Sequence, residues 1–173
     1  MRTGVKKARK GPGGILAPEV CTHKSGLELL RSMLRGELPH PPMSDTLDFD
    51  LSEVEEGRVV FVGEPRFEFY NPFGSVHGGW QAALLDTCMA CAAWTALPAG
   101  TIHTTVEMKV NYLKPIFDAT GPLLAEGRVI QKGQRIATTE GRLSDASGKL
   151  YAHGSATFIL LPADILGSNK QCE

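Results

Sequence analysis

Long hydrophobic runs and a strong excess of one charge are both missing from this chain of 173 residues. No apolar run reaches the roughly 18 residues that span a bilayer, so we expect no membrane segment. Basic and acidic side chains nearly balance at a net charge of −1, which gives no general case for nucleic-acid binding. With 42% hydrophobic residues, the chain is expected to fold as one domain around a sizeable core.

We also expect no secretory signal. The first residues carry basic side chains without the apolar segment that such a signal requires, and a Gly/Pro run follows at residues 11–14. These features predict a flexible basic tail over residues 1–24, with weak contact to an anionic surface as the alternative. A single domain is expected over residues 25–162 and a C-terminal tail over residues 163–173.

The chain has only four cysteines, and their spacing does not match that of a metal site. Cys88 and Cys91 form one C-x-x-C pair, whereas a zinc site of this type needs a second pair. A redox pair places its first cysteine at the start of a helix, but this pair falls inside a predicted helix. We therefore expect these cysteines to pack the helix, and we expect no metal. Reduced cysteines without an export signal predict a cytoplasmic protein.

The spacing of apolar residues predicts an α+β fold. Residues from Val76 to about Leu97 are apolar nearly all round, which is typical of a buried helix. A short amphipathic helix is expected from Ser25, which can cap it, to Arg35. Alternation of apolar and polar residues predicts strands at about 46–51, 58–69, 102–113, 121–131, 135–145 and 150–161. The expected architecture is one long buried helix wrapped by a curved antiparallel sheet of about five to six strands.

The stretch from Asn71 to Gly79, with the acid that follows it, carries the strongest functional signal. His77 precedes Gly78 and Gly79 at the start of the long helix, where backbone N–H groups lack partners and carry the positive end of the dipole. Glycine leaves these groups approachable. Asp86 follows in an apolar run, where a carboxylate is costly unless it is paired, solvated or used. Hydrolysis of an activated carbonyl requires such an anion-stabilising helix end beside an acid.

This motif, followed by the alternating strand that ends in Asn111-Tyr-Leu-Lys-Pro115, resembles the hotdog fold. Within that fold it is most similar to the phenylacetate-degradation type of acyl-CoA thioesterase, over about residues 25–161. The resemblance implies a homodimer, often paired again as a tetramer, whose active sites are shared between two subunits. The two open edges of a curved sheet favour the same dimer. The implied substrate is a coenzyme A thioester, and no cofactor is implied.

The resemblance also implies roles for single residues. Asp86 is the general base or the nucleophile, and an N–H of Gly78 or Gly79 polarises the thioester carbonyl. Asn71 orients water or substrate, with stabilisation of its own turn as the alternative. Thr105 supplies a hydroxyl where relatives have serine.

Other interpretations stay open at this point. Asp86 can instead neutralise a core partner such as Lys109 or accept a backbone cap. For His77 we favour a hydrogen bond that closes the turn over a direct role as a base. The alternative for the whole protein is a hotdog protein that binds acyl-CoA without turnover, as a sensor or carrier. A hotdog hydratase would pair a histidine with an acid in a context that we do not find.

Coenzyme A carries phosphates, so a basic rim is expected around its binding site. A predicted turn can cradle a pyrophosphate with its N–H groups, and it consists of Lys132, Gly133, Gln134 and Arg135. Lys114 and Arg128 are further candidates, with solvated surface charge as the alternative for each. Trp80 can line an acyl pocket, although an aromatic residue here is also typical of plain core.

Overall fold

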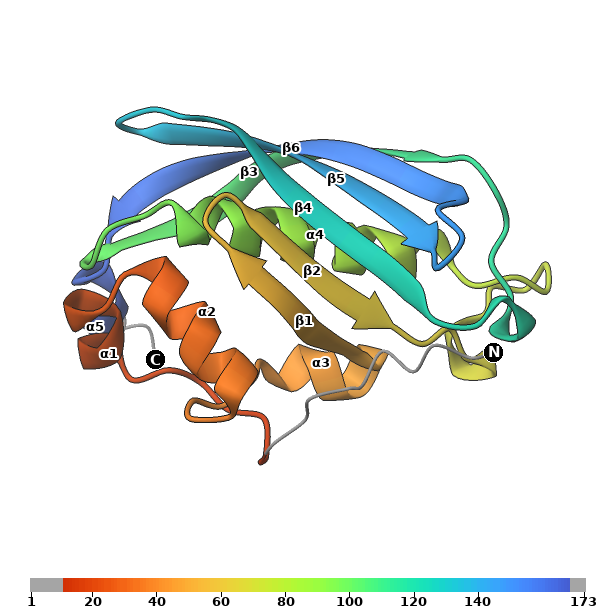
Figure 1. The fold of residues 1–173 in the computed structure, drawn as a ribbon, viewed down its shortest axis with the longest axis horizontal. Helices are drawn as coiled ribbons and strands as arrows, with labels where there is room; N and C mark the ends of the chain where they lie inside the picture. Colours follow the sequence, from red (N-terminus) through yellow and green to blue (C-terminus); the bar gives the residue numbers. More distant parts are fainter. Residues whose placement is uncertain (1–10, 169–173) are drawn as a thin grey trace.

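The computed structural model describes residues 11–168. Its strands are β1 (Phe49–Glu55), β2 (Arg58–Gly63), β3 (Thr101–Tyr112), β4 (Leu123–Lys132), β5 (Ile136–Asp145) and β6 (Leu150–Pro162). Its helices are α1 (Pro18–His23), α2 (Gly26–Arg35), α3 (Pro42–Leu47), α4 (Gly78–Thr95) and α5 (Ile165–Ser168), with 3-10 turns η1 (Phe67–Phe69) and η2 (Asp118–Thr120). The six antiparallel strands lie in the order β1-β2-β4-β5-β6-β3 and curve around α4 (Figure 1). The predicted α+β hotdog architecture is confirmed.

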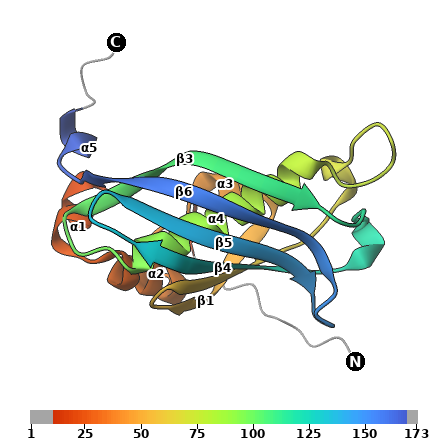
Figure 2. The ribbon, with the colours of Figure 1, turned by 90° about the horizontal axis from the view of Figure 1, so that it is seen from above.

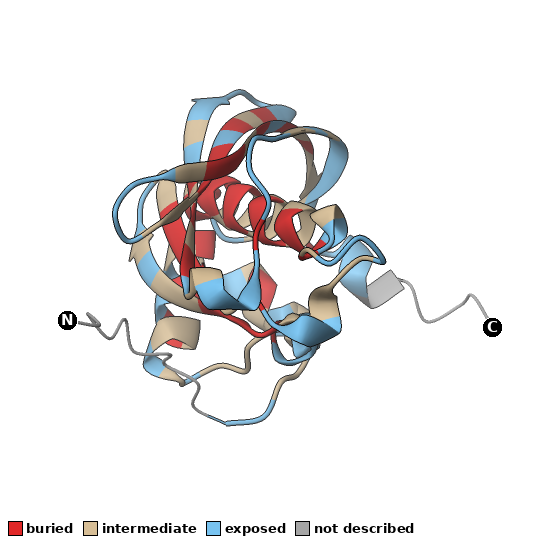
Figure 3. Ribbon diagram, turned by 90° about the vertical axis from the view of Figure 1, so that its right-hand side faces the viewer, coloured by how far each residue is buried: buried red, intermediate tan, exposed pale blue. Residues whose placement is uncertain are grey.

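The helix α4 begins and ends where its sequence provides a cap and a stop. His77 is the N-cap residue, and its ring accepts a hydrogen bond from the Gly79 N–H. Pro98 cannot continue the helix beyond Leu97, because its ring removes the N–H and clashes with the preceding turn. Figure 3 shows α4 mostly in the colour of buried residues, beneath the sheet. Its fully buried side chains are Leu84, Leu85, Cys88, Met89, Ala92 and Ala93.

Two glycines bring the sheet close to this helix. Gly127 of β4 faces the backbone of Cys88, and a Cβ at this position would collide with the Cys88 carbonyl group. Gly141 of β5 faces Met89, whose Cγ would lie 2.9 Å from an added Cβ. The helix is therefore seated against the sheet in part through backbone contact, which larger residues would prevent.

The strand β3 lies along one margin of the sheet and has a hydrogen-bonded neighbour on one side only, β6 (Figure 2). Its register with β6 shifts between Thr105 and Glu107, so Val106 is an inserted bulge residue, 62% exposed. The opposite edge strand, β1, is contacted by α2 and α3. Among residues 11–168, no strand pairs with the second edge of β3.

The structure corrects two strand predictions. The strand predicted at 58–69 ends at Gly63, because Pro65 offers no N–H to a ladder and residues 67–69 form η1. The strand predicted at 46–51 begins only at Phe49, because α3 occupies the preceding residues with Pro42 in its first turn. The other four strands and the two predicted helices lie within two residues of their expected bounds.

Both predicted tails contain short helices. α1 lies inside the segment 1–24, and its Cys21 is buried against Leu29 and Ala163. α5 lies inside the segment 163–173. The basic residues at positions 2–10 and Cys172 lie outside the described residues. Within residues 11–168, no helix is both long and apolar enough to cross a membrane.

Candidate active site

Asp86 lies midway along α4, on the side that the sheet leaves part-exposed. Thr105 of β3 donates its hydroxyl to Oδ1 of Asp86 at 3.0 Å. Asp86 forms no ion pair with any described residue, so Lys109 does not neutralise it. The adjacent side chains on this face of the helix are small, at Ala82, Ala83 and Ala90. The structure therefore presents one approachable carboxylate, oriented by a neighbouring hydroxyl.

The N-terminus of α4 offers one backbone donor. The Gly79 N–H donates to Nδ1 of His77 at 2.8 Å, which is the turn-closing hydrogen bond favoured for this histidine. The Gly78 N–H makes no hydrogen bond to the part of the chain that the structure describes. Of the two glycines, Gly78 is therefore the one whose N–H is available to a ligand, at the positive end of the helix dipole.

Asn71 holds the loop that leads into α4. Its Oδ1 accepts hydrogen bonds from the N–H groups of Phe73 at 2.9 Å and Ser75 at 3.4 Å, and its Nδ2 donates to the Ser75 hydroxyl at 3.0 Å. The side chain thus fixes the loop on which His77 and Gly78 are mounted. This geometry supports the alternative that Asn71 acts by positioning the turn.

A groove of about 380 Å³ opens at this end of α4, between the loop and the segment that follows β3. Gly78 lies in its wall, together with Lys114 and the ring of Tyr112. A Cβ at Gly78 would lie 3.2 Å from Cζ of Tyr112. The structure thereby brings three predicted site residues together in one groove: Asn71, Gly78 and Lys114.

Asp86 and Gly78 do not meet within one chain. They are eight residues apart on α4, which corresponds to about 12 Å along the helix axis. The distance from a backbone donor through a thioester carbonyl and an attacking water to a carboxylate is at most about 10 Å when all the contacts are aligned. One chain alone therefore cannot apply both groups to the same carbonyl.

The basic residues predicted to bind the phosphates of coenzyme A do not lie together in one chain. Lys132, Gly133, Gln134 and Arg135 form or border the hairpin between β4 and β5. This hairpin lies at the opposite end of the molecule from the loop before α4 (Figures 1 and 2). Only Lys114 lies beside Gly78.

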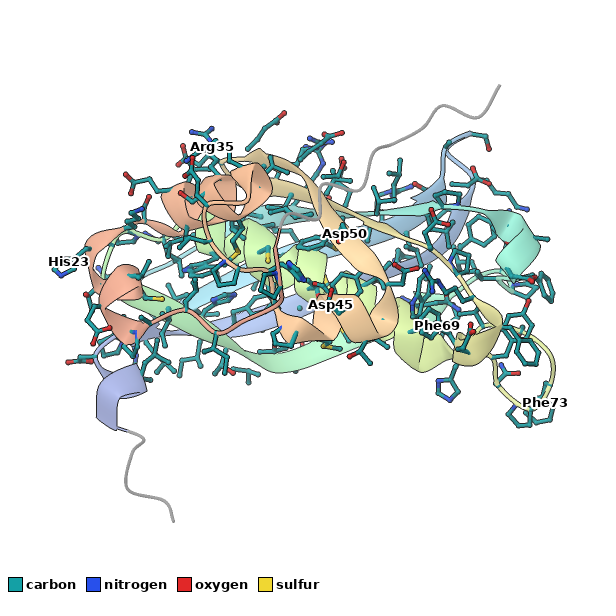
Figure 4. All side chains as sticks on the ribbon, turned by 90° about the horizontal axis from the view of Figure 1, so that it is seen from below. His23, Arg35, Asp45, Asp50, Phe69 and Phe73 are labelled. Atoms are coloured by element: carbon teal, nitrogen blue, oxygen red, sulfur yellow. The ribbon has the colours of Figure 1, made fainter. Side chains whose placement is uncertain are left out.

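Trp80 belongs to the core in this structure. It is 3% exposed, its Nε1–H donates to the Leu47 carbonyl oxygen at 2.8 Å, and its ring stacks on Phe69. One edge still borders a shallow hollow shared with His77 and Ala83. Phe73, by contrast, points outward at the tip of its loop (Figure 4). Trp80 therefore supplies a rigid wall near the helix start.

Sequence reasoning missed His103, which precedes Thr105 by two residues on β3 and faces the same helix. Its ring lies against Trp94 and Phe158. Burial lowers the pKa of His103 below its ordinary value, while a hydrogen bond to the Ala90 backbone and the charge of Asp86 oppose that shift. Strand alternation alone could have placed residues 103 and 105 on one face.

Both cysteines of the C-x-x-C pair lie within α4, where Cys88 is buried and Cys91 is partly buried. Burial, assisted by the nearby charge of Asp86, raises the pKa of the Cys91 thiol to about 12. Burial likewise raises the pKa of Cys88 well above its ordinary value. Thiols of this kind are inert at neutral pH, which agrees with a packing role.

Comparison with known proteins assigns the chain to a family. The thioesterase superfamily matches residues 73–152, which include α4 and β3. The protein SSO2140 of Saccharolobus solfataricus, named as an esterase, is 33% identical over 115 residues, or 66% of this chain and 80% of the relative. The chain belongs to the thioesterase superfamily. It is accordingly a hydrolase that acts on thioester bonds.

Solved structures agree with this assignment and with the predicted phenylacetate-degradation type. A phenylacetic acid degradation-related protein of Ralstonia eutropha matches with a TM-score of 0.69 and 30% identity, covering 75% of this chain and 98% of that one. A mutant of PaaI from Thermus thermophilus matches with a TM-score of 0.62 and 25% identity, covering 68% and 97%. Human acyl-coenzyme A thioesterase 13 is 28% identical over 108 residues, or 62% of this chain and 76% of the relative.

Proposed function

We propose that the protein hydrolyses acyl-coenzyme A thioesters, with Asp86 as the reacting carboxylate. The observation that carries this proposal is the geometry of Asp86, a part-exposed acid in an apolar helix that has a hydroxyl partner but no described cation. Keeping such an acid is costly unless it is used. The likeness to human acyl-coenzyme A thioesterase 13 supports coenzyme A as the leaving group.

The reaction needs only groups of this chain and water. Asp86 takes a proton from water as the water oxygen attacks the acyl carbon, and the carbonyl oxygen becomes negatively charged. The Gly78 N–H stabilises that charge. The C–S bond then breaks, coenzyme A leaves as the thiolate and receives the proton, and the acyl group leaves as the free acid.

Direct attack by Asp86 gives an anhydride that water hydrolyses to the same products. Incorporation of ¹⁸O from water into Asp86 during a single turnover distinguishes the second route.

The distance of about 12 Å between Gly78 and Asp86 along α4 supports a site shared by two protomers. In a dimer with antiparallel α4 helices, Gly78 of one chain approaches Asp86 of the other. The bare edge of β3 and the small residues around Asp86 suit such an interface. We extend the proposal to a dimer of dimers acting in the cytoplasm, where the free thiols of Cys88 and Cys91 stay reduced.

The hairpin at residues 132–135 belongs to the same proposal. Within one chain this hairpin lies far from Gly78. It can therefore bind coenzyme A only at a site that is completed by the start of α4 in the partner subunit. There Lys132, Arg135 and the backbone N–H groups of the hairpin would bind the phosphates of coenzyme A, with Lys114 nearer to the thioester.

Thiol release from a panel of short, medium, long and aryl acyl-CoA thioesters tests the function. We expect wild-type turnover, and for Asp86→Ala a loss of about 10³-fold in kcat with the fold intact. Glu140→Gln, which changes an exposed acid on β5, is the matched control and should keep full activity. Tight binding of acyl-CoA without any turnover by the wild type would instead indicate a sensor or carrier. Equal activity of Asp86→Ala and wild type would show that another group is the catalytic acid.

A further inference from the structure

Gln81 is a buried amide without a partner. It is only 4% exposed, and its Oε1 is fully buried with no hydrogen-bond partner in the structure. The whole side chain makes no hydrogen bond to any residue between 11 and 168. Buried polar groups are nearly always paired, and an unpaired one costs about 1–3 kcal/mol. An apolar side chain at position 81 would avoid this cost, so Gln81 makes the fold less stable than it could be.

The position of Gln81 indicates what the amide faces. It follows Gly78 by three residues on α4, so both residues lie on neighbouring rows of one helix face. Side chains in a helix point back toward its N-terminus and cover the preceding turn. Gln81 and Gly78 both line the groove that also holds Lys114. Because Oε1 is the enclosed end of the amide, Nε2 is the end directed at the opening.

The polar neighbours of Gln81 in the described part of the chain do not pair with it. Trp80, its neighbour in sequence, has its own acceptor in the Leu47 carbonyl, and both the oxygen and the nitrogen of the Asn71 amide form hydrogen bonds within their own loop. Tyr112, on the opposite wall, presents its ring to Gly78. Two of the donors in this groove that lack an acceptor among residues 11–168 come from one turn of α4: the Gly78 N–H and the Gln81 Nε2–H.

We propose that Gln81 is a second donor to the thioester carbonyl, so that its Nε2–H and the Gly78 N–H together hold the oxygen that becomes an oxyanion. The inference rests on the proposed thioesterase function and adds a catalytic residue to it. Two donors fix the direction of the carbonyl as well as its charge, and each becomes stronger as charge develops on the oxygen. The amide gains its missing hydrogen bond only when substrate is bound.

The variant that tests this role is Gln81→Met, which keeps the length of the side chain and removes both polar atoms. We expect kcat to fall about 100-fold with KM little changed, because the hydrogen bond strengthens in the transition state. We also expect the melting temperature to stay equal or rise, because an unpaired buried oxygen is removed. A residue that served only structure would show the reverse pattern, with lost stability and proportionate loss of active protein.

Ligand binding provides an independent readout. An acyl-dethia-coenzyme A ketone retains the carbonyl oxygen, whereas an alkyl-coenzyme A thioether lacks it. We expect Gln81→Met to weaken binding of the ketone about tenfold and to leave binding of the thioether unchanged, as follows from loss of one hydrogen bond to that oxygen. Equal effects on both ligands would overturn the proposal.

Thr139→Val is the matched control. Thr139 of β5 is also fully buried with an unpaired hydroxyl, but it does not line the groove. It should match Gln81→Met in stability and keep wild-type kcat. Wild-type kcat in Gln81→Met, with Asp86→Ala inactive, would overturn the role of Gln81 and leave the thioesterase proposal standing. Failure of Gln81→Met to fold would also overturn it, because an unpartnered amide should be dispensable for folding. Absence of wild-type turnover would remove both proposals.

Discussion

The two long sides of α4 are packed in opposite ways. The side toward the sheet is closed within one chain, where Leu84, Leu85 and Met89 are fully buried and Gly127 admits backbone contact. The other side, which carries Asp86 and Ala90, stays part-exposed, and its strand β3 has a bare edge. The first side is closed within one chain, whereas the second leaves the carboxylate of Asp86 approachable beside the Thr105 hydroxyl. The packing that stabilises the fold and the chemistry that we propose for Asp86 therefore lie on opposite sides of a single helix.

The separation explains how a costly acid is tolerated in an apolar helix. Burial of apolar surface on the sheet side stabilises the helix whatever occupies position 86. Small residues on the open side keep the carboxylate approachable, and Thr105 orients it without neutralising its charge. Substitutions on the two sides should accordingly affect different measurements.

The largest effect is expected on the sheet side, for Gly127→Ala. The added methyl group meets the backbone of Cys88, which cannot rotate away, so we expect a loss of about 3 kcal/mol in the free energy of unfolding. Gly78→Ala adds the same group on the open side, 3.2 Å from the Tyr112 ring, and should leave stability nearly unchanged. Denaturant unfolding of both variants checks the contrast, and equal losses would show that the two sides are packed alike.

Removal of one N–H on the open side should affect activity instead. Gly78→Pro deletes the donor at the first helical position, where proline is tolerated, and His77 already has an extended backbone (φ −59°, ψ 138°) that suits a residue before proline. We expect kcat to fall about 100-fold with stability preserved. Gly78→Ala retains the N–H and serves as the control. Similar kcat values for the two variants would place the oxyanion donor elsewhere.

A smaller loss is expected for Thr105→Val, which keeps the β-branched shape and removes the hydroxyl that binds Asp86. Loss of one hydrogen bond to a charged group should reduce kcat about tenfold. Thr105→Ser keeps the hydroxyl and should restore most of the activity. If Thr105→Ser and Thr105→Val have the same kcat, the hydroxyl has no role in orienting Asp86.

The smallest effect concerns pH, through His103. Its pKa is lowered in the folded protein, so the unfolded chain binds the proton first as pH falls below the ordinary value of 6.5. The folded state is therefore expected to lose stability from about pH 6.5 downward, and His103→Phe should flatten that loss while it keeps the contacts with Trp94 and Phe158. Melting temperatures at pH 7.5 and 5.5 check this, and an unchanged slope in the variant would contradict it.

The fold could be predicted where local chemistry and periodicity agree. The long helix was bounded within two residues because His77 caps it and Pro98 stops it. Four strands followed from alternation and from the short turns at Gly133 and Gly148. The end of β2 was missed because Phe67 and Phe69 continue the alternation, although Pro65 interrupts the ladder. Short helices such as α3 depend on packing more than on propensity and leave little signal.

The candidate site was predictable only in part. The motif supplied Asp86 and the pair Gly78 and Gly79, and the resemblance supplied Thr105, whose hydroxyl lies 3.0 Å from Asp86 in the structure. Gln81 could not be found in this way, whereas strand alternation could have placed His103 on the face of Thr105. In the sequence, a buried polar residue only interrupts a run of apolar residues. Coordinates are needed to show whether its side chain has a hydrogen-bond partner.

The shared site is the central claim, and mixed dimers test it most directly. Asp86→Ala and Gly78→Pro chains, each expected to be strongly impaired alone, can be co-expressed with different affinity tags and purified as the mixed species. In such a dimer one site carries both lesions and the other carries neither. The account predicts that the mixed dimer regains about half of the wild-type activity. A mixed dimer as inactive as its parents would mean that each site takes Asp86 and Gly78 from the same chain, contrary to the geometry of α4.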